Sequence, residues 1–243
     1  MSRPDREYIY GINSCFEVVR AGKRTVFNVY LNKTSTRNPR IRKLSQFLER
    51  TNIPLHWVDK QQLTSMADSR DHQGAVLEAT HYPYRRSDDL WGEPPILLLD
   101  NVEDPHNVGA ILRSAEIFGF TTVLLPIRGV PDIYPSVVKI AAGATEFLNI
   151  AKDASANSYI RSAKSEDYSI IVLDMSGTID IRDLREKLQP KFMVIIGGED
   201  RSVGQYILNN ADYVTSIHQH GKINSLNASV AAAISLFALQ KVQ

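Results

Sequence analysis

Apolar positions in the first third of the chain alternate between helix-like and strand-like spacing. Helical spacing favours helices near residues 13–21 and 39–51. Short runs rich in β-branched and other apolar residues favour strands near 26–31, 54–58 and 75–79. Because the two kinds of element alternate, residues 1–80 predict a small α/β domain.

Residues 81–95 break this pattern. They hold three prolines, a glycine and several charged residues without an apolar period, a composition typical of a loop. We therefore expect a linker over 81–95 and a second domain over 96–243. The length of 243 residues and the hydrophobic content of 43% would also fit one large domain.

The second segment alternates strands and helices many times. The predicted strands are 96–100, 122–125, 169–173, 192–196 and 213–217. The predicted helices are 107–119, 135–142, 155–164, 180–188, 203–209 and 225–241. This order is typical of a parallel, doubly wound α/β sheet. Neither G-x-G-x-x-G after the first strand nor G-K-[ST] anywhere is present, which excludes the usual dinucleotide and P-loop signatures.

The other global features favour a cytoplasmic protein. The single cysteine, Cys15, excludes an internal disulfide framework, and the polar opening 1–7 lacks the apolar core of a signal peptide. No apolar run approaches the roughly 20 residues that span a bilayer, so we expect no membrane association.

A net charge of +1 hides an uneven distribution. Residues 1–90 hold 15 basic and 10 acidic side chains, whereas residues 91–243 hold 13 and 17. Between Arg20 and Leu48 there is no acidic residue. We predict an RNA-binding, phosphate-contacting surface here. An ordinary solvated face is an equally open alternative. The basic residues of this stretch are Arg20, Lys23, Arg24, Lys33, Arg37, Arg40, Arg42 and Lys43, and all of them except Lys33 are candidate RNA contacts.

Three polar, glycine-bearing clusters in the second segment suggest one composite site. The first is Asn107 to Arg113, preceded by Asp104-Pro105 as a plausible helix cap and first helical residue. The others are 197–204 and 217–227. Polar groups at a helix entry suit an anionic or sugar-phosphate ligand.

Together these clusters resemble the motifs of the SpoU/TrmH family of SPOUT RNA methyltransferases. The first motif is similar to Asp104-Pro-His-Asn-Val-Gly-Ala-Ile-Leu-Arg-Ser-Ala-Glu-Ile-Phe-Gly119, the second to Ile196-Gly-Gly-Glu-Asp-Arg-Ser-Val-Gly204 and the third to Ser225-Leu-Asn-Ala-Ser-Val-Ala-Ala. Order and spacing both match over about 92–243, and three ordered motifs are far more specific than one.

The resemblance extends upstream. Tyr10-Gly-Ile-Asn-Ser-Cys-Phe-Glu-Val-Val and His72-Gln-Gly74 are similar to the small ribosomal-protein-like RNA-binding domain of the branch that methylates the 2'-oxygen of ribosomal guanosines. That branch implies a guanosine of 23S, large-subunit rRNA as substrate. A plain turn leading into the strand 75–79 would explain Gly74 equally well.

The family further implies a deep trefoil knot in the C-terminal domain, S-adenosyl-L-methionine as cofactor, and a homodimer. Pattern alone gives no indication of the knot, since threaded chains are rare. By match to the family, the adenine of the cofactor would be held by Gly197, Gly198, Ile217 and Leu226.

Five residues match the family's catalytic positions: Arg113, Asn107, Glu199, Ser225 and Asn227. A guanidinium stays protonated at physiological pH, so stabilising a developing alkoxide suits Arg113 better than acting as base. Asn107 could orient a ribose or merely cap a helix, and Ser225 is a candidate N-cap of the last helix. His106 is a second candidate for the base.

One departure from the family is visible. Where the family usually has Ile-Pro and an apolar residue, this chain has Ile217-His-Gln-His-Gly221. Loss of the proline frees a backbone dihedral and adds an N–H donor. No third ligand lies near His218 and His220 in sequence, so we predict no metal site.

Two other functions fit the sequence. One is a tRNA ribose 2'-O-methyltransferase, which is less consistent with the N-terminal domain. The other is a non-catalytic RNA-binding or ribosome-assembly protein that keeps the fold, which the presence of all five catalytic-position residues disfavours.

Overall fold

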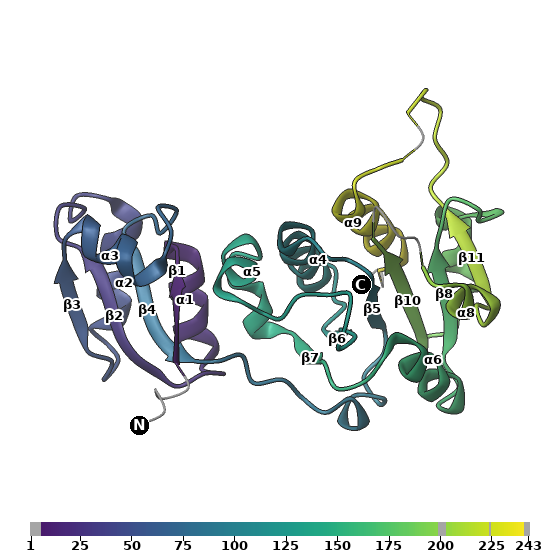
Figure 1. Cartoon of the computed structure of the whole chain (residues 1–243), viewed down its shortest axis with the longest axis horizontal. Coiled ribbons are helices and arrows are strands. Elements are labelled where there is room, and N and C mark those ends of the chain that lie inside the picture. Colours follow the sequence, from purple (N-terminus) through teal and green to yellow (C-terminus); the bar gives the residue numbers. More distant parts are fainter. Residues whose placement is uncertain (1–5, 199–202, 224, 241–243) are drawn as a thin grey trace. The chain divides into compact units, whose positions relative to one another are not determined.

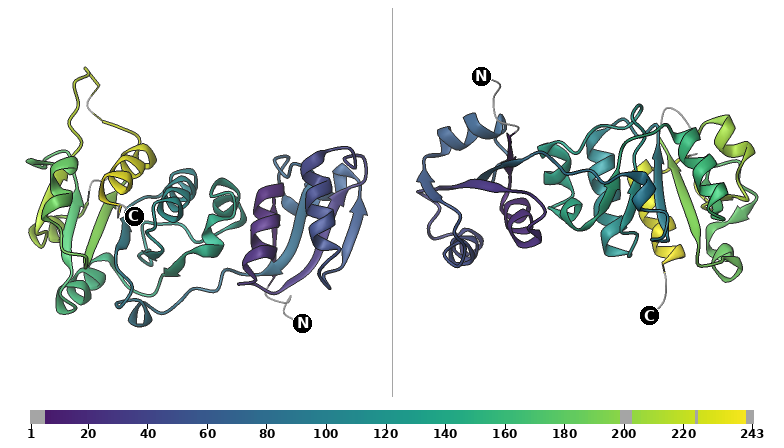
Figure 2. Two further views of the ribbon diagram at one scale, coloured as in Figure 1. Left: turned by 180° about the vertical axis from the view of Figure 1, so that it is seen from behind. Right: turned by 90° about the horizontal axis from the view of Figure 1, so that it is seen from below.

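The computed structural model describes residues 6–198, 203–223 and 225–240. The chain folds as two compact units (Figures 1 and 2). Unit 1 comprises Met1–Pro83 and Ile133–Glu146, and unit 2 comprises Tyr84–Asp132 and Phe147–Gln243. The sequence placed 133–146 within the domain 96–243, whereas the contacts of this segment group it with unit 1.

Unit 1 is built on a four-stranded sheet in the order β1-β4-β2-β3. Strand β4 runs antiparallel to both neighbours, and β3 pairs parallel with β2. Figure 2 shows α1 and α2 on one face and α3 on the other. In chain order the elements are β1 (Arg6–Tyr10), α1 (Ile12–Ala21), β2 (Val26–Asn32), α2 (Pro39–Leu48), β3 (Leu55–Val58), α3 (Lys60–Ala67), β4 (Ala75–Thr80), α5 (Pro135–Ile140) and the 3₁₀ turn η2 (Ala144–Phe147).

The elements predicted for residues 1–80 are confirmed, and β1 and α3 were not predicted. Only Ile9 is buried in β1, and only Leu63 in α3, so neither segment has a clear apolar period. A local signal for α3 was nevertheless present, because Asp59 and Gln62 form a capping box at its start.

Residues 133–146 pack against α1 and β1. The Ser14 hydroxyl donates to the carbonyl of Val138 at 3.4 Å. Gly143 has a φ of +88°, and a Cβ there would lie 2.5 Å from the Cβ of Glu17. This turn therefore requires glycine, both for its backbone conformation and for the close approach to α1.

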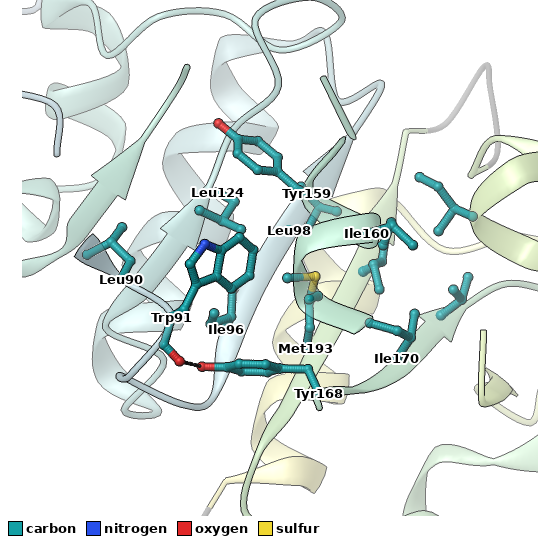
Figure 3. Packing of buried hydrophobic residues seen from close by; sticks show 14 of the residues in the cluster. Leu90, Trp91, Ile96, Leu98, Leu124, Tyr159, Ile160, Tyr168, Ile170 and Met193 are labelled. Carbon is teal, nitrogen blue, oxygen red and sulfur yellow. Dashed lines mark hydrogen bonds between the residues drawn. The ribbon is translucent and has the colours of Figure 1, made fainter. Parts of the chain in front are cut away.

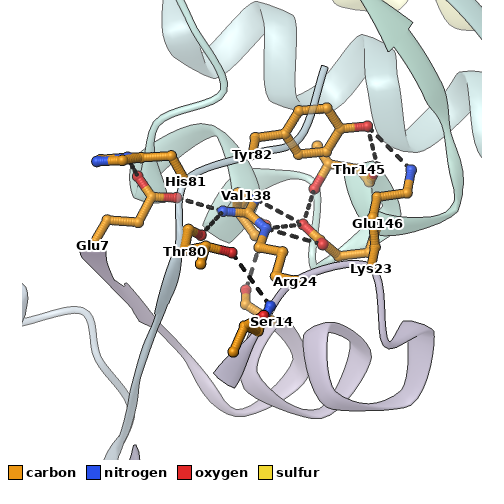
Figure 4. A network of polar contacts seen from close by, with 11 residues as sticks. Glu7, Ser14, Lys23, Arg24, Thr80, His81, Tyr82, Val138, Thr145 and Glu146 are labelled. Carbon is orange, nitrogen blue, oxygen red and sulfur yellow. Dashed lines mark hydrogen bonds and ion pairs between the residues drawn. The ribbon is translucent and has the colours of Figure 1, made fainter. Parts of the chain in front are cut away.

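A buried ion network ties the same segment to the start of β2 (Figure 4). The Arg24 side chain is fully buried and donates to both carboxylate oxygens of Glu146 at 2.8–3.1 Å, with a second ion pair to Glu7. Burial acts to lower the pKa of Arg24, but the bonds to Glu146 outweigh it, so its pKa is raised. This burial contradicts the prediction that Arg24 contacts RNA, because its guanidinium is turned inward to two carboxylates.

Unit 2 is a seven-stranded sheet in the order β7-β6-β5-β10-β8-β11-β9, with every neighbouring pair parallel. The predicted parallel α/β sheet is confirmed. Its elements are η1 (Ser87–Asp89), β5 (Ile96–Asp100), α4 (Pro105–Ile117), β6 (Thr122–Leu124), β7 (Asn149–Ala151), α6 (Ala156–Ser165), β8 (Ser169–Leu173), β9 (Ile179–Asp180), α7 (Ile181–Leu184), η3 (Arg185–Lys187), β10 (Phe192–Gly197), α8 (Gln205–Asn209), β11 (Tyr213–Ser216) and α9 (Ala228–Leu239).

Three details of unit 2 differ from the pattern-based prediction. The short strands β7 and β9 were not predicted, because three and two residues carry no period. The predicted helix over 180–188 is a short α7 followed by the 3₁₀ turn η3. The trefoil knot that the family resemblance implies is a separate matter and stays a prediction.

Both faces of this sheet are covered. Figure 3 shows Leu98, Ile170 and Met193 packed against Tyr159 and Ile160 of α6. The intervening strand residues are equally buried, and α9 packs against β10 on their side; they are Leu97, Leu99, Val194 and Ile196. Coverage of both faces explains why these strands appear in the sequence as continuous apolar runs.

Within the described part of the chain, no helix is both long and apolar enough to cross a membrane.

Candidate active site

A cavity of about 610 Å³ opens where β8, β10 and β11 end. This is the edge at which open α/β sheets bind ligands, and the volume is in the range of small-molecule sites. Its walls come from the ends of these strands, the loops that follow them and the start of α9. The lining residues are Leu173, Asp174, Met175, Ile196, Gly197, Gly198, Val203, Ser216, Ile217, His218, Gln219, Gly221, Ile223, Ser225, Leu226, Asn227, Ala228 and Ala231.

The structure thus brings together most of the predicted site. Residues Gly197 and Gly198 of the second motif line the same cavity as the third motif and Ile217. Glu199 lies outside the described residues. Leu226 is 37% exposed and so presents an apolar side chain at the cavity wall.

A hydrogen bond joins the first motif to the site. The amide nitrogen of Asn227 donates to the amide oxygen of Asn107 at 2.9 Å. Asp104 accepts from the His106 N–H as the N-cap of α4 and Pro105 is the first helical residue, as predicted. Asn107 therefore lies inside the helix and is not its cap.

The predicted cap of the last helix is wrong. Helix α9 begins at Ala228, and its N-cap is Asn227, whose side-chain oxygen accepts from the N–H groups of Ser229 and Val230 at 3.0 and 3.4 Å. Ser225 lies two residues before the cap, in the cavity wall. The Asn227 side chain thus caps α9 with its oxygen and holds α4 with its nitrogen.

Asp100 is a site residue that the sequence analysis missed. Its backbone carbonyl accepts from Gly198 N–H at 3.0 Å, and its carboxylate accepts from Gly204 N–H at 3.1 Å. Asp100 therefore holds both ends of the loop that carries the second motif. Burial raises the pKa of this carboxyl, against the opposing effect of the Gly204 N–H. The available signal was an acidic residue ending an otherwise apolar strand.

The loop after β8 supports the third motif's loop. Asp174 N–H donates to the Thr215 carbonyl at 2.9 Å. A Cβ at Gly177 would lie 2.3 Å from the carbonyl carbon of Thr215, so only glycine fits there. Backbone contact with β11 therefore fixes where the segment 217–221 begins.

The rings of the two histidines of that segment pack against each other. The rings of His218 and His220 are edge to face, with centroids 4.6 Å apart. Among the described residues, no group of three or more His, Cys, Asp or Glu side chains could hold a metal ion.

Two successive segments of the chain match separate family models. Residues 94–237 match the SpoU rRNA methylase family, and residues 8–85 match the substrate-binding domain of RNA 2'-O ribose methyltransferases. The chain belongs to the SpoU rRNA methylase family. This confirms the resemblance drawn from its three motifs.

Relatives of this SpoU-family chain match it over nearly its full length. An uncharacterized tRNA/rRNA methyltransferase of Archaeoglobus fulgidus is 32% identical over 95% of this chain and 96% of its own. YacO of Bacillus subtilis, named as a TrmH-family tRNA/rRNA methyltransferase, is 24% identical over 97% and 95%.

Solved structures share the fold. The crystal structure of an RNA 2'-O ribose methyltransferase superposes with a TM-score of 0.79 at 24% identity and covers 97% of this chain and 88% of its own. An AdoMet-bound rRNA methyltransferase of Sinorhizobium meliloti gives 0.79 at 19%, with coverage of 97% and 87%.

Arg113 lies apart from the cavity lining. It is exposed on α4, one helical turn before Ile117, which is 62% exposed. His106 is exposed on the same helix. Within one copy of this SpoU-family chain, Arg113 is therefore not among the residues that line the cavity.

The basic surface predicted on unit 1 is partly present. Arg37, Arg40, Arg42 and Lys43 are exposed on α2 and the loop before it. Arg20 is paired with Glu17 at 2.7 Å. Lys23 is half-buried and donates to the Tyr82 hydroxyl at 3.3 Å.

Proposed function

We propose that this chain is an S-adenosyl-L-methionine-dependent RNA methyltransferase that methylates a ribose 2'-hydroxyl, in a guanosine of 23S rRNA, in the cytoplasm. The observation that carries the proposal is the joining of three motifs at one cavity, with Asn107 bonded to Asn227 at its edge. Membership of the SpoU family and the fold shared with an AdoMet-bound rRNA methyltransferase support it.

The cavity residues fit the cofactor. Ile217 and Leu226 supply apolar walls for an adenine, and Gly197 and Gly198 leave the neighbouring cavity wall without side chains that would obstruct it. When bound, S-adenosyl-L-methionine supplies an electrophilic methyl group on a sulfonium.

The chain's own residues then have to align the ribose and stabilise charge on its oxygen. Orientation can contribute roughly 7–11 kcal/mol in well-aligned reactions. Asn107 is positioned by Asn227, and Arg113 presents a planar, permanently charged donor. We assign Arg113 to stabilising the developing alkoxide and holding the adjoining phosphate.

A second copy of the chain completes this proposal. Helices α4 and α9 pack together and expose an apolar strip made by Ile117, Val230, Ile234 and Phe237, which are 38–62% exposed. Phe237 also meets Phe118 edge to face at 5.7 Å, linking the two helices. An exposed apolar strip of this kind is typical of a homodimer interface. Arg113 lies on α4, the helix that contributes Ile117 to the strip.

Phe237→Asp is expected to convert the dimer to a monomer, because it places a charge within the apolar strip. Sedimentation velocity at a concentration where the native chain is dimeric measures this. Ile127→Asp is the matched control, since Ile127 is 54% exposed but lies in a loop outside the strip. A Phe237→Asp variant that stays dimeric would place the interface elsewhere.

Asp100→Leu is expected to weaken binding of S-adenosylhomocysteine about tenfold, because a hydrogen bond to a charged group contributes ~1.5–3 kcal/mol and this one holds the Gly198–Gly204 loop. Calorimetry on the full chain measures the affinity. Asp100→Asn keeps an acceptor for the Gly204 N–H and is expected to retain most of it. Native affinity in a folded Asp100→Leu variant would remove this role.

Ribose-methylation mapping of total RNA with and without the protein tests the proposed reaction. A 2'-O-methyl group lost from one 23S guanosine in its absence is the expected result. A lost tRNA ribose methylation would instead support the tRNA enzyme. An unchanged RNA with intact cofactor binding would support a non-catalytic RNA-binding or ribosome-assembly role.

A further inference from the structure

One face of the unit 1 sheet carries a row of aromatic and polar side chains. Cross-strand register places Tyr8 opposite Glu78, Glu78 opposite Asn28, and Tyr30 opposite His56. Alternate residues of a strand share a face, so these side chains all project from one side of β1, β4, β2 and β3. Ile9, Val29 and Leu77, which alternate along the strands with members of this row, are fully buried, so the row lies on the more open face of the sheet.

The polar members of the row bind one another. Glu78 accepts from Arg6 at 3.0 Å and from Asn28 at 2.7 Å, and Asn28 in turn contacts the His56 ring nitrogen at 3.0 Å. Burial acts to raise the pKa of Glu78, but these two donors lower it overall. The carboxylate is therefore ionised and balances Arg6, which leaves the row without a strong excess of charge.

The aromatic members flank this polar chain. Tyr30 and His56 are stacked, with ring centroids 5.2 Å apart and planes at 24°. Tyr8 is 37% exposed, His56 is exposed, and Tyr30 is half-buried and so still presents part of its ring to solvent. Tyr8 and Tyr30 lie two strands apart, which is roughly 10 Å at the usual strand spacing. That separation leaves each ring able to take a different base.

We propose that Tyr8, Tyr30 and His56 form a stacking platform for unpaired bases of the RNA substrate. The proposal rests on the proposed function and adds a second kind of contact to it. Flat, solvent-accessible rings stack on bases of any sequence, and sequence-specific RNA recognition mainly uses unpaired bases. A balanced surface does not attract phosphates strongly, so this face binds bases while the exposed cations of α2 serve the backbone.

The two contacts differ in how they respond to salt. Neutralising a phosphate contact lowers the log–log salt slope of RNA binding by about 0.7–0.9. Loss of a stacking ring lowers affinity and leaves that slope unchanged. The proposal therefore predicts that loss of a platform ring weakens RNA binding by the same factor at every salt concentration.

The test uses the full chain and single-stranded fragments of 23S rRNA, with binding measured at several salt concentrations. Tyr8→Ala is expected to weaken binding by roughly tenfold with an unchanged salt slope, and Tyr30→Ala is expected to do the same. Tyr8→Phe and Tyr30→Phe keep the rings and are expected to bind as the native chain does. Replacing Arg37, Arg40, Arg42 and Lys43 together by glutamine should instead flatten the slope.

Tyr206→Ala is the matched control, because Tyr206 is 38% exposed but lies on α8 in unit 2. Affinity for S-adenosylhomocysteine is measured in parallel and is expected to stay unchanged in every variant. Native RNA affinity in Tyr8→Ala, or equal losses in the alanine and phenylalanine variants, would overturn the platform. Because ribose methylation by the native chain is assayed separately, that result would leave the proposed function standing.

Discussion

Arg113→Lys is expected to slow methyl transfer by about 10²–10³, the usual effect of removing one positioned transition-state donor. Lysine conserves the charge but offers an ammonium in place of a planar, two-pronged guanidinium. A residue exposed on α4 and outside the cavity lining can be changed with little effect on folding or on the cofactor site. The rate is measured in a single turnover with saturating RNA, so that binding and product release do not enter.

Arg161→Lys serves as the control, because Arg161 is an exposed arginine on α6 and outside the cavity lining. It is expected to leave the rate unchanged, and RNA affinity is expected to survive in both variants. A near-native single-turnover rate in Arg113→Lys would assign Arg113 to structure or binding. His106 would then be the first residue to test as the base.

Glu146→Ala is expected to cost about 3–5 kcal/mol of unfolding free energy, because it leaves the buried Arg24 guanidinium without its main partner. Equilibrium urea unfolding of the full chain measures this. The exposed pair of Arg20 and Glu17 is the matched control: Arg20→Met is expected to cost no more than ~1 kcal/mol.

The combined variant Arg24→Met with Glu146→Leu distinguishes an unpaired charge from lost packing. Apolar replacements of a buried ion pair often keep or raise stability, so the double variant should be more stable than Glu146→Ala alone. Equal losses in the two would mean that the network contributes through shape. A native-like Glu146→Ala would show that residues 133–146 are not held by this pair.

Much of unit 2 could be predicted because its information is local. Apolar runs buried on both faces predicted β5, β8 and β10, and the Asp104-Pro105 cap predicted the start of α4. Strands β1, β7 and β9 could not be found this way. They are short or contain few buried residues, and pairing with neighbouring strands is what makes them strands.

Within the candidate site, residue types were predictable and contacts were not. The motifs pointed to Asn107 and Asn227, but the bond between them spans 120 positions in sequence. Asp100 ends an apolar strand, which marks it as unusual, but its carboxylate holds Gly204, 104 positions away, and that contact could not be predicted from the sequence.

The basic run shows most clearly what each level determined. The sequence by itself established that Arg24 and Arg37 belong to a stretch without acidic residues, and that its cations favour a polyanion. Only the tertiary structure separated them. Arg37 stays exposed, whereas Arg24 is buried against Glu146, 122 positions away. Burying a guanidinium is favourable only beside a carboxylate, and which carboxylate reaches it depends on where the chain returns in space.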